Sequence, residues 1–219
     1  MKETYSTLVG PSVGEFRDRG SKFIAYAFPV VLESEWQQHL EEVRKAHPKA
    51  RHACFAYRIG LDGTVFRAND DGEPSGTAGR PILGQIDSAG LTNVFIVVVR
   101  YFGGTLLGTS GLINAYRTAA AEAIQAAEIR EKKVESQFEL TFHYALMNDI
   151  MNSLKKLDVR VVEQEFGEGA RLIIAIPRSA VSETFLRLKA MVAHVHLEEA
   201  ALIEEINGLE IRRVPVNGE

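Results

Sequence analysis

The clearest pattern of apolar and polar residues lies in the part of the chain after residue 133. Between 134 and 142 the apolar residues share one parity against polar neighbours, which predicts a half-buried strand. The elements predicted from this point are a strand over 134–142, a helix over 147–157, strands over 159–166 and 170–176, a helix over 181–192 with Ser179 as its N-cap, and a weaker strand over 200–206. The resulting order, βαββαβ, is that of a ferredoxin-like domain.

The first 130 residues show a mixed pattern of strands and helices. The elements predicted there are strands over 4–9, 22–28, 53–59, 65–68 and 93–100, and helices after Ser34 and from Ser110. The strand over 93–100 is apolar on both parities, which predicts a central strand covered on both faces of its sheet. Ser34 and Gln37 have the spacing of a capping box, and Pro48 ends the helix that follows them. The chain as a whole is therefore predicted to be α+β.

The formal net charge of −4 is unevenly divided along the 219 residues. Residues 1–130 hold 14 basic and 14 acidic side chains, whereas residues 131–219 hold 11 and 15. The polar segment 130–133 is a candidate linker, which predicts a first domain over 1–131 and a second over 132–219. A neutral first domain permits local contact with nucleic acid but excludes a broad basic surface.

The composition narrows the class of protein further. With 46% hydrophobic and 25% charged residues, the chain is that of a folded globular protein. Its longest apolar run, Val94–Val99, is far shorter than the roughly 20 residues that span a bilayer. The first residues lack an apolar signal core, so we expect a cytoplasmic protein. The single cysteine, Cys54, excludes a disulfide framework and a multi-thiolate metal site.

The first polar cluster is the predicted strand Arg51-His52-Ala53-Cys54-Phe55-Ala56-Tyr57-Arg58. His52 and Cys54 are two positions apart, so their side chains project from the same face. A Cys–His nucleophile pair is one interpretation. A small buried thiol is the other, and it fits the apolar neighbours of Cys54 better. We therefore expect no catalytic residue here.

The second cluster is a long polar loop that begins at Asp70. It contains Asp70, Asp71, Glu73, Ser75 and Thr77 among glycines and a proline. Three carboxylates within four positions suit a hard cation such as Mg²⁺, although the spacing matches no standard metal loop. Asp-Gly and Pro-Ser-Gly equally predict a capped turn. These residues are therefore predicted either to order the loop or to form a ligand site.

The third cluster lies between a buried strand and a helix, where backbone amides and the helix dipole attract phosphate. The predicted phosphate contacts are Gly103, Gly104, Gly108, Thr109 and Ser110. The spacing approaches that of a phosphate-binding P-loop, but Thr109 stands where such a loop has its lysine. An ordinary P-loop NTPase is therefore disfavoured.

Together these clusters resemble the YigZ/IMPACT family. The residues that carry the resemblance are Arg51–Arg58, Asp70–Gly79, Asn93–Gly104, Leu107-Gly108, Gly111-Leu112 and Ala115-Tyr116. The resemblance implies a first domain like the second domain of ribosomal protein S5 and the fourth of elongation factor G. It implies a second domain like the fifth domain of that factor. Eukaryotic relatives that carry a further N-terminal module regulate translation initiation.

The glycine loop departs from the usual pattern of the family at three positions. Leu106 replaces a common lysine, Ser110 a common glycine and Asn114 a common arginine. The loss of two cations is expected to weaken any contact with phosphate.

We therefore predict a translation-associated protein that binds structured RNA or the ribosome, without a cofactor, metal or membrane. The basic side chains expected to contact phosphates are Arg51, Arg67, Arg80 and Arg100. The residues expected to order the loops or line a ligand site are His52, Asp70, Asp71, Glu73, Ser75, Thr77 and Tyr116.

Two alternatives stay open. One is a magnesium-dependent enzyme that acts on a nucleotide or another phosphorylated small molecule, with the metal on Asp70 and Asp71. The other is a protein-interaction module that uses the acidic second domain, where glutamates between 198 and 205 would attract a basic partner.

Overall fold

The computed structural model describes residues 3–61 and 63–215, and the outermost residues of both predicted domains lie outside these ranges. The chain forms two compact units, the first ending at Lys132 and the second beginning at Lys133. Both units contain helices and sheets, so the predicted α+β class is confirmed. No helix among the described residues is long and apolar enough to cross a membrane.

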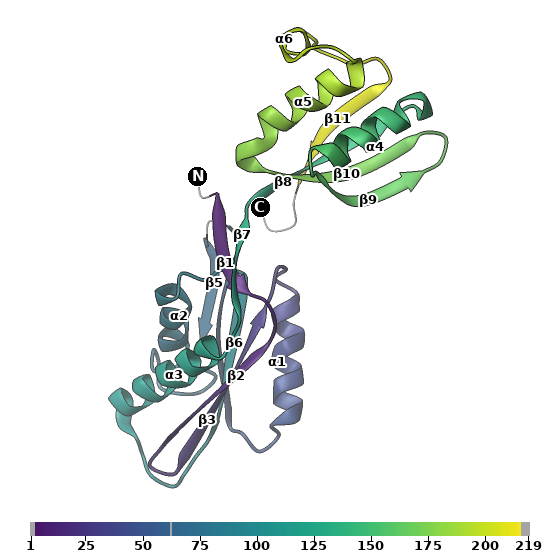
Figure 1. Cartoon of the computed structure of the whole chain (residues 1–219). Helices are drawn as coiled ribbons and strands as arrows, with labels where there is room; N and C mark the ends of the chain where they lie inside the picture. The colour runs from purple at the N-terminus through teal and green to yellow at the C-terminus, as the bar shows by residue number, and fades with distance from the viewer. Residues whose placement is uncertain (1–2, 62, 216–219) are drawn as a thin grey trace. The chain divides into compact units, whose positions relative to one another are not determined.

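The first unit is built on a five-stranded antiparallel sheet (Figure 1). Its strands, in sheet order, are β2 (Ser12–Asp18), β3 (Ser21–Pro29), β6 (Val94–Tyr101), β4 (His52–Ile59) and β5 (Val65–Asn69). As predicted, β6 is central, and its residues from Val94 to Arg100 are all buried. Because both faces of this strand are covered, its apolar side chains contribute to two separate cores.

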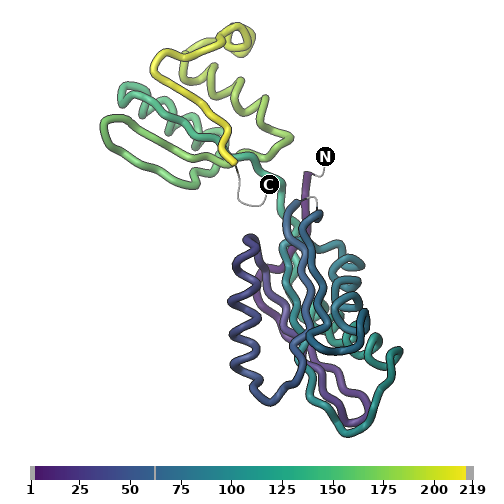
Figure 2. The backbone as a smooth tube through the Cα atoms, turned by 180° about the vertical axis from the view of Figure 1, so that it is seen from behind, coloured from purple at the N-terminus to yellow at the C-terminus, as the bar shows by residue number. Residues whose placement is uncertain are grey.

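The helices of the first unit lie on opposite faces of the sheet. The helix α1 (Glu35–Ala46) covers one face, while α2 (Gly79–Ser88) and α3 (Gly108–Gln125) cover the other (Figure 2). Trp36, Leu40 and Val43 are the buried residues of α1 and form its inner side. Tyr116 and the alanines of α3 are buried in the core of the opposite face.

The second unit has the predicted ferredoxin-like order. Its elements are β8 (Glu135–Phe142), α4 (Met147–Lys156), β9 (Arg160–Phe166), β10 (Ala170–Pro177), α5 (Val181–Ala193), the short α6 (Leu197–Ala200) and β11 (Leu209–Val214). The antiparallel sheet runs in the order β11-β8-β10-β9. The strands predicted over 159–166 and 170–176 are confirmed as β9 and β10, which pair antiparallel as a hairpin. The two long helices bury a single core against one face of the sheet.

Several boundaries differ from the predictions. The last strand is β11. Ala200 ends the short helix α6, and the residues from 201 to 206 continue as a turn and irregular structure, in which Leu202 is 84% exposed. The N-cap of α5 is Ala180, since Ser179 lies in a single 3₁₀ turn before the helix. The helix α3 begins at Gly108, two residues before the predicted start. The strand β2 and the helix α2 were not predicted.

Two further local predictions differ from the structure. The boundary between the two units falls inside segment 130–133, but this segment is not irregular: it belongs to β7 (Ile129–Lys133), which pairs with β1 (Thr4–Leu8) in a separate two-stranded sheet. Ser34 occupies the N-cap of α1 but makes no side-chain capping bond. Instead, Glu35 Oε2 accepts hydrogen bonds from the amides of Val31 and Leu32, at 2.5 and 2.9 Å.

The close approach of β2 to α3 depends on Gly14. A Cβ atom at this position would lie 2.2 Å from the backbone nitrogen of Ala123. We expect Gly14→Ala to lower the free energy of unfolding by about 1–3 kcal/mol, because the backbones would have to separate. Urea denaturation measures this change. Gly84→Ala is the matched control: its Cβ would have no atom within 4 Å, and alanine favours the helix, so α2 should be slightly stabilised. Equal behaviour of the two variants would contradict the packing argument.

Candidate functional site

The candidate site lies between the sheet and the loop that joins β5 to α2. His52 on β4 and Arg100 on β6 are cross-strand partners, so their side chains share the face that α2 and α3 cover. His52 Nδ1 lies 2.7 Å from the carbonyl oxygen of Asp71, which draws the acidic loop onto this face. The residues that sequence analysis assigned to two separate clusters therefore meet in one place.

A buried ion pair lies at the centre of the site. Arg100 Nη1 is 2.7 Å from Glu73 Oε1, and the two side chains are only 8% and 4% exposed. The guanidinium also lies over the rings of Phe23 and Phe102, at 5.5 and 5.6 Å from their centroids. Arg100 Nε is buried and has no hydrogen-bond partner among the described residues. Arg100 therefore holds the acidic loop on the sheet through Glu73, and its charge is not exposed to solvent.

Tyr116 and Cys54 complete the buried cluster. The Tyr116 hydroxyl donates to Glu73 Oε1 at 2.8 Å, so this carboxylate oxygen accepts from both Tyr116 and Arg100. Cys54 Sγ lies 3.0 Å from the Asp70 carbonyl oxygen and 3.3 Å from the Tyr116 hydroxyl. Burial raises the pKa of both the thiol and the phenol well above their ordinary values. The thiol therefore stays protonated, which fits a packing role and not that of a nucleophile.

Asp70 organises the backbone of the loop. Its carboxylate accepts hydrogen bonds from the amides of Gly76, Ala78 and Gly79, at 2.8, 3.0 and 2.8 Å. Partial burial by itself would raise the pKa of Asp70, but these three amides, together with the charge of Arg80, outweigh it and lower the pKa below its ordinary value. Because Ala78 and Gly79 begin α2, Asp70 caps that helix from outside it.

Asp71 connects the loop to the opposite face of the sheet. Its Oδ2 accepts from the Ala53 amide at 2.7 Å, and its Oδ1 accepts from Arg44 Nη2 at 2.8 Å. Asp70, Asp71 and Glu73 thus turn their carboxylates to three different sets of donors. No group of three or more potential metal ligands occurs among the described residues. This donor arrangement supports loop ordering and disfavours a magnesium site.

Ser75 and Thr77 occupy different environments within the acidic loop. Ser75 is exposed, whereas Thr77 is buried and donates to the carbonyl oxygen of Pro74 at 2.7 Å. Thr77 therefore stabilises the turn itself.

The four candidate arginines occupy three different environments. Arg51 and Arg80 are exposed, and neither forms a direct ion pair within the described part of the chain, although Arg80 is close enough for its charge to act on Asp70. Arg67 lies over the ring of Trp36, 5.7 Å from its centroid, on the side of the sheet that α1 covers. Arg100 is internal. The set therefore does not form one continuous basic surface.

The glycine loop between β6 and α3 is exposed over most of its length. Gly103 packs against the turn between β2 and β3, where a Cβ would lie 1.9 Å from the Gly20 carbonyl carbon. Its amide donates to Ser21 Oγ at 3.1 Å. Gly104 and Gly108 both have positive φ and open surroundings. Thr109 and Ser110 lie exposed in the first turn of α3.

Sequence analysis missed a polar group on the α1 side of the sheet. His47 lies between two tyrosines, with Nε2 2.7 Å from the Tyr26 hydroxyl and Nδ1 2.7 Å from the Tyr101 hydroxyl. Arg44, which pairs with Asp71, projects from the last turn of α1. The sequence around Arg44 gives no local indication that this side chain contacts Asp71, which lies 27 residues later in the chain.

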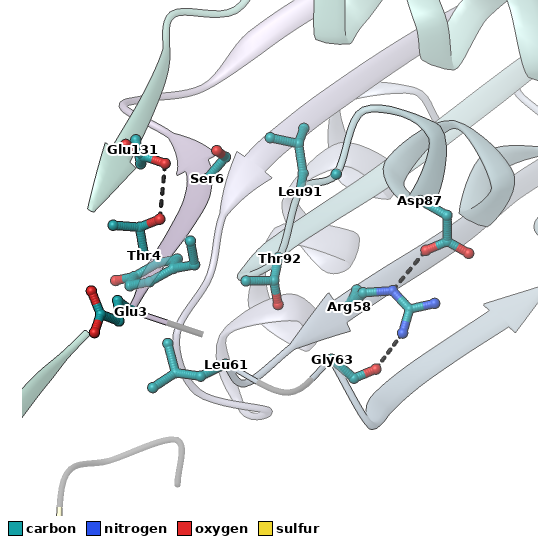
Figure 3. Close-up of a pocket in the computed structure, with 12 residues that line it drawn as sticks. Glu3, Thr4, Ser6, Arg58, Leu61, Gly63, Asp87, Leu91, Thr92 and Glu131 are labelled. Atoms are coloured by element: carbon teal, nitrogen blue, oxygen red, sulfur yellow. Dashed lines mark hydrogen bonds and ion pairs between the residues drawn. The ribbon is translucent and has the colours of Figure 1, made fainter. Parts of the chain in front are cut away.

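A cavity of about 480 Å³ opens at the other end of β4 (Figure 3). Arg58 Nε donates to Asp87 at 2.7 Å, and Arg58 also donates to the Gly63 carbonyl oxygen. Glu3 and Glu131 line the opposite side, where Glu131 accepts from Thr4 at 2.9 Å. Its lining carries more carboxylates than cations, so this cavity is unsuited to phosphate.

The comparisons with known proteins agree with the resemblance noted in the sequence. The model of the Impact N-terminal domain matches residues 19–124. The chain is 34% identical to the IMPACT family member YvyE of Bacillus subtilis over 168 residues, which cover 77% of each protein. The chain belongs to the IMPACT family. A second member, YigZ of Escherichia coli, is 35% identical over 151 residues, which cover 68% of this chain and 74% of YigZ. A crystal structure described as that of a hypothetical protein matches 98% of this IMPACT family chain and 99% of its own, with a TM-score of 0.73 and 28% identity.

The buried ion pair predicts a large effect of removing one partner. We expect Arg100→Met to lower the free energy of unfolding by about 3–5 kcal/mol, because Glu73 would remain buried without its cation. Arg44→Met is the control: it breaks a pair whose side chains are 50% and 28% exposed, and should cost less than about 1 kcal/mol. Chemical denaturation at pH 7 measures both changes. Similar losses in the two variants would show that the Glu73–Arg100 pair has no special structural role.

The lowered pKa of Asp70 predicts a pH-dependent contribution to stability. Its folded pKa lies below the ordinary value of 3.8, so the stabilisation is present above that value and is lost as pH falls through the folded pKa. Asp70→Asn should therefore be destabilised at pH 7, and the difference from the wild type should shrink towards pH 3. Urea midpoints measured across this range test the sign, and a constant difference would contradict it.

Proposed function

We propose that this IMPACT family chain is a translation-associated regulatory protein whose first unit binds RNA through phosphate contacts. Membership of the family supports the regulatory role, since the resemblance implies relatives that act on translation. The observation that carries the RNA contact is the exposure of Arg51 and Arg80, neither of which forms a direct ion pair with a described carboxylate, although the charge of Arg80 acts on Asp70. Such guanidinium groups are available to phosphate oxygens.

The exposed loop before α3 supplies the second part of the proposed interface. In the described structure, the amides of residues 104–107 donate no hydrogen bond within the chain. The loop leads directly into the first turn of an 18-residue helix, where the dipole favours an anion. Phe102 is 50% exposed at the start of this loop and offers a ring on which a base can stack.

Arg67 and Arg100 take different parts in this proposal. Arg100 acts through Glu73, as a residue that positions the acidic loop. Arg67 lies over the rings of Trp36 and Phe55, so its guanidinium is already engaged in contacts within the first unit. Arg51, Arg80 and the loop amides therefore remain the proposed direct contacts, which implies weak, local and salt-sensitive binding.

The second unit favours a protein partner over RNA. The sheet face opposite its helices carries charged side chains on all four strands, and Arg171 lies 2.5 Å from Glu139 and 3.2 Å from Glu163. The acidic residues of this face are Glu135, Glu139, Glu163, Glu165 and Glu210, against Arg160, Arg171 and Arg212. The surplus of carboxylates opposes phosphate and would attract a basic protein surface.

Filter binding of ribosomal or transfer RNA at low salt tests the proposed interface. We expect the double variant Arg51→Ala/Arg80→Ala to weaken binding and to reduce the slope of log affinity against log salt by about 1.5, because two phosphate contacts are lost. Arg187→Ala, an exposed arginine on α5, is the control and should leave the slope unchanged. The RNA proposal fails if the wild type retains no RNA, or if the double variant behaves like the control.

A further inference from the structure

A second cavity, of about 360 Å³, lies on the α1 side of the sheet where β4 begins. Ala53 and Val99, which are cross-strand partners, form its apolar base. Its polar lining comes from Arg44 and His47 at the end of α1, from Arg51 before β4, and from Asp71 of the acidic loop. Three separate segments of the first unit therefore contribute to one hollow.

The charge of this lining favours an anion. Arg44 and Arg51 contribute two cations, and Asp71 contributes one carboxylate. Burial, together with the charge of Lys22, lowers the pKa of His47, so its ring is neutral at pH 7. The lining therefore carries a net charge of about +1 next to an apolar base, where electrostatic attraction is stronger than in open solvent.

The hydrogen bonds around the cavity leave both arginines able to bind a ligand. Arg51 is exposed and forms no ion pair with any described residue. Arg44 is held by Asp71 Oδ1, but Asp71 Oδ2 also accepts from the Ala53 amide at 2.7 Å. Arg44 can therefore turn to an incoming anion while Asp71 keeps a donor.

We propose that this cavity binds a phosphate group, with Arg51 as the first contact and Arg44 as the second. Two guanidinium groups suit the several oxygens of a phosphate, with which each can form paired hydrogen bonds. The phosphate can belong to RNA or to a small molecule, and only the first source rests on the proposed function. Binding of the phosphate would break the ion pair between Arg44 and Asp71 and so remove one contact of the acidic loop. Asp70 and Glu73 would still hold the conformation of that loop.

Titration with inorganic phosphate, followed by ¹H–¹⁵N NMR of the full chain, tests the site. At constant ionic strength we expect saturable shifts of the Ala53 and Val99 amides, which sodium chloride does not reproduce. Arg51→Gln should weaken the apparent affinity by about tenfold, the loss of one charge-assisted contact. Arg44→Gln should weaken it as well, whereas the control Arg187→Gln should bind like the wild type. The dispersion of the spectra verifies that each variant is folded.

The same titration with a nucleoside monophosphate and with a short RNA distinguishes the two sources of phosphate. Saturable shifts with phosphate or the monophosphate support the site even if RNA is not retained on filters, in which case only the proposed function fails. Non-saturable shifts, or equal affinities of Arg51→Gln and the wild type, overturn the site even if RNA binds through the loop before α3.

Discussion

The buried ion pair between Glu73 and Arg100 determines how the acidic loop lies on the sheet. Arg100 belongs to the central strand, so its position is set by the packing on both faces of β6. Glu73 must reach this point, and Tyr116 of α3 binds the same carboxylate oxygen. With the middle of the loop held there, Asp70 meets the amides that begin α2, and Asp71 meets Ala53 and Arg44. One buried contact thus sets the direction of three carboxylates.

This arrangement separates the arginines of the first unit into structural and available groups. Arg100 and Arg58 are largely buried and bonded to carboxylates, while Arg51 and Arg80 remain exposed without ion pairs among the described residues. Counting arginines along the chain therefore overestimates the positive charge that a ligand meets. The net charge of zero over the first 130 residues arises partly because carboxylates of the acidic loop form ion pairs with arginines inside the unit.

Local patterns predicted those elements whose burial follows a regular period. The strands β6 and β10 were predictable because their apolar residues are buried, whereas β9, which is mostly exposed, was predictable because it is followed by a glycine-rich turn and then by β10. The strand β7 was not, since all five of its residues are exposed and it is defined by backbone pairing with β1, more than a hundred residues earlier. The strand predicted over 200–206 was wrong because Leu202, although apolar, is exposed. The strand β11 was not predicted because its sequence contains several charged residues.

The site was predictable in composition but not in geometry. The acidic loop and Arg100 were recognisable as candidate site residues, and both lie in segments that carry the resemblance to the IMPACT family. Which carboxylate meets Arg100, and that Asp70 bonds to three backbone amides, depends on the path of the loop in space. The sequence did not indicate a role for Arg44 or His47, because their hydrogen-bond partners lie on other elements that are distant in sequence.

The pairing of β1 with β7 has a consequence for how such a unit can be combined with others. The first and last strands of the unit are neighbours in one small sheet, and Val9 also donates to the Glu128 carbonyl at 2.9 Å. Entry and exit of the polypeptide therefore lie side by side, at a place remote from the Glu73–Arg100 pair along β4 and β6. A unit with adjacent ends can be inserted into, or appended to, another protein without disturbing its core. A unit of this architecture can therefore be joined to different domains without a change in its buried cluster.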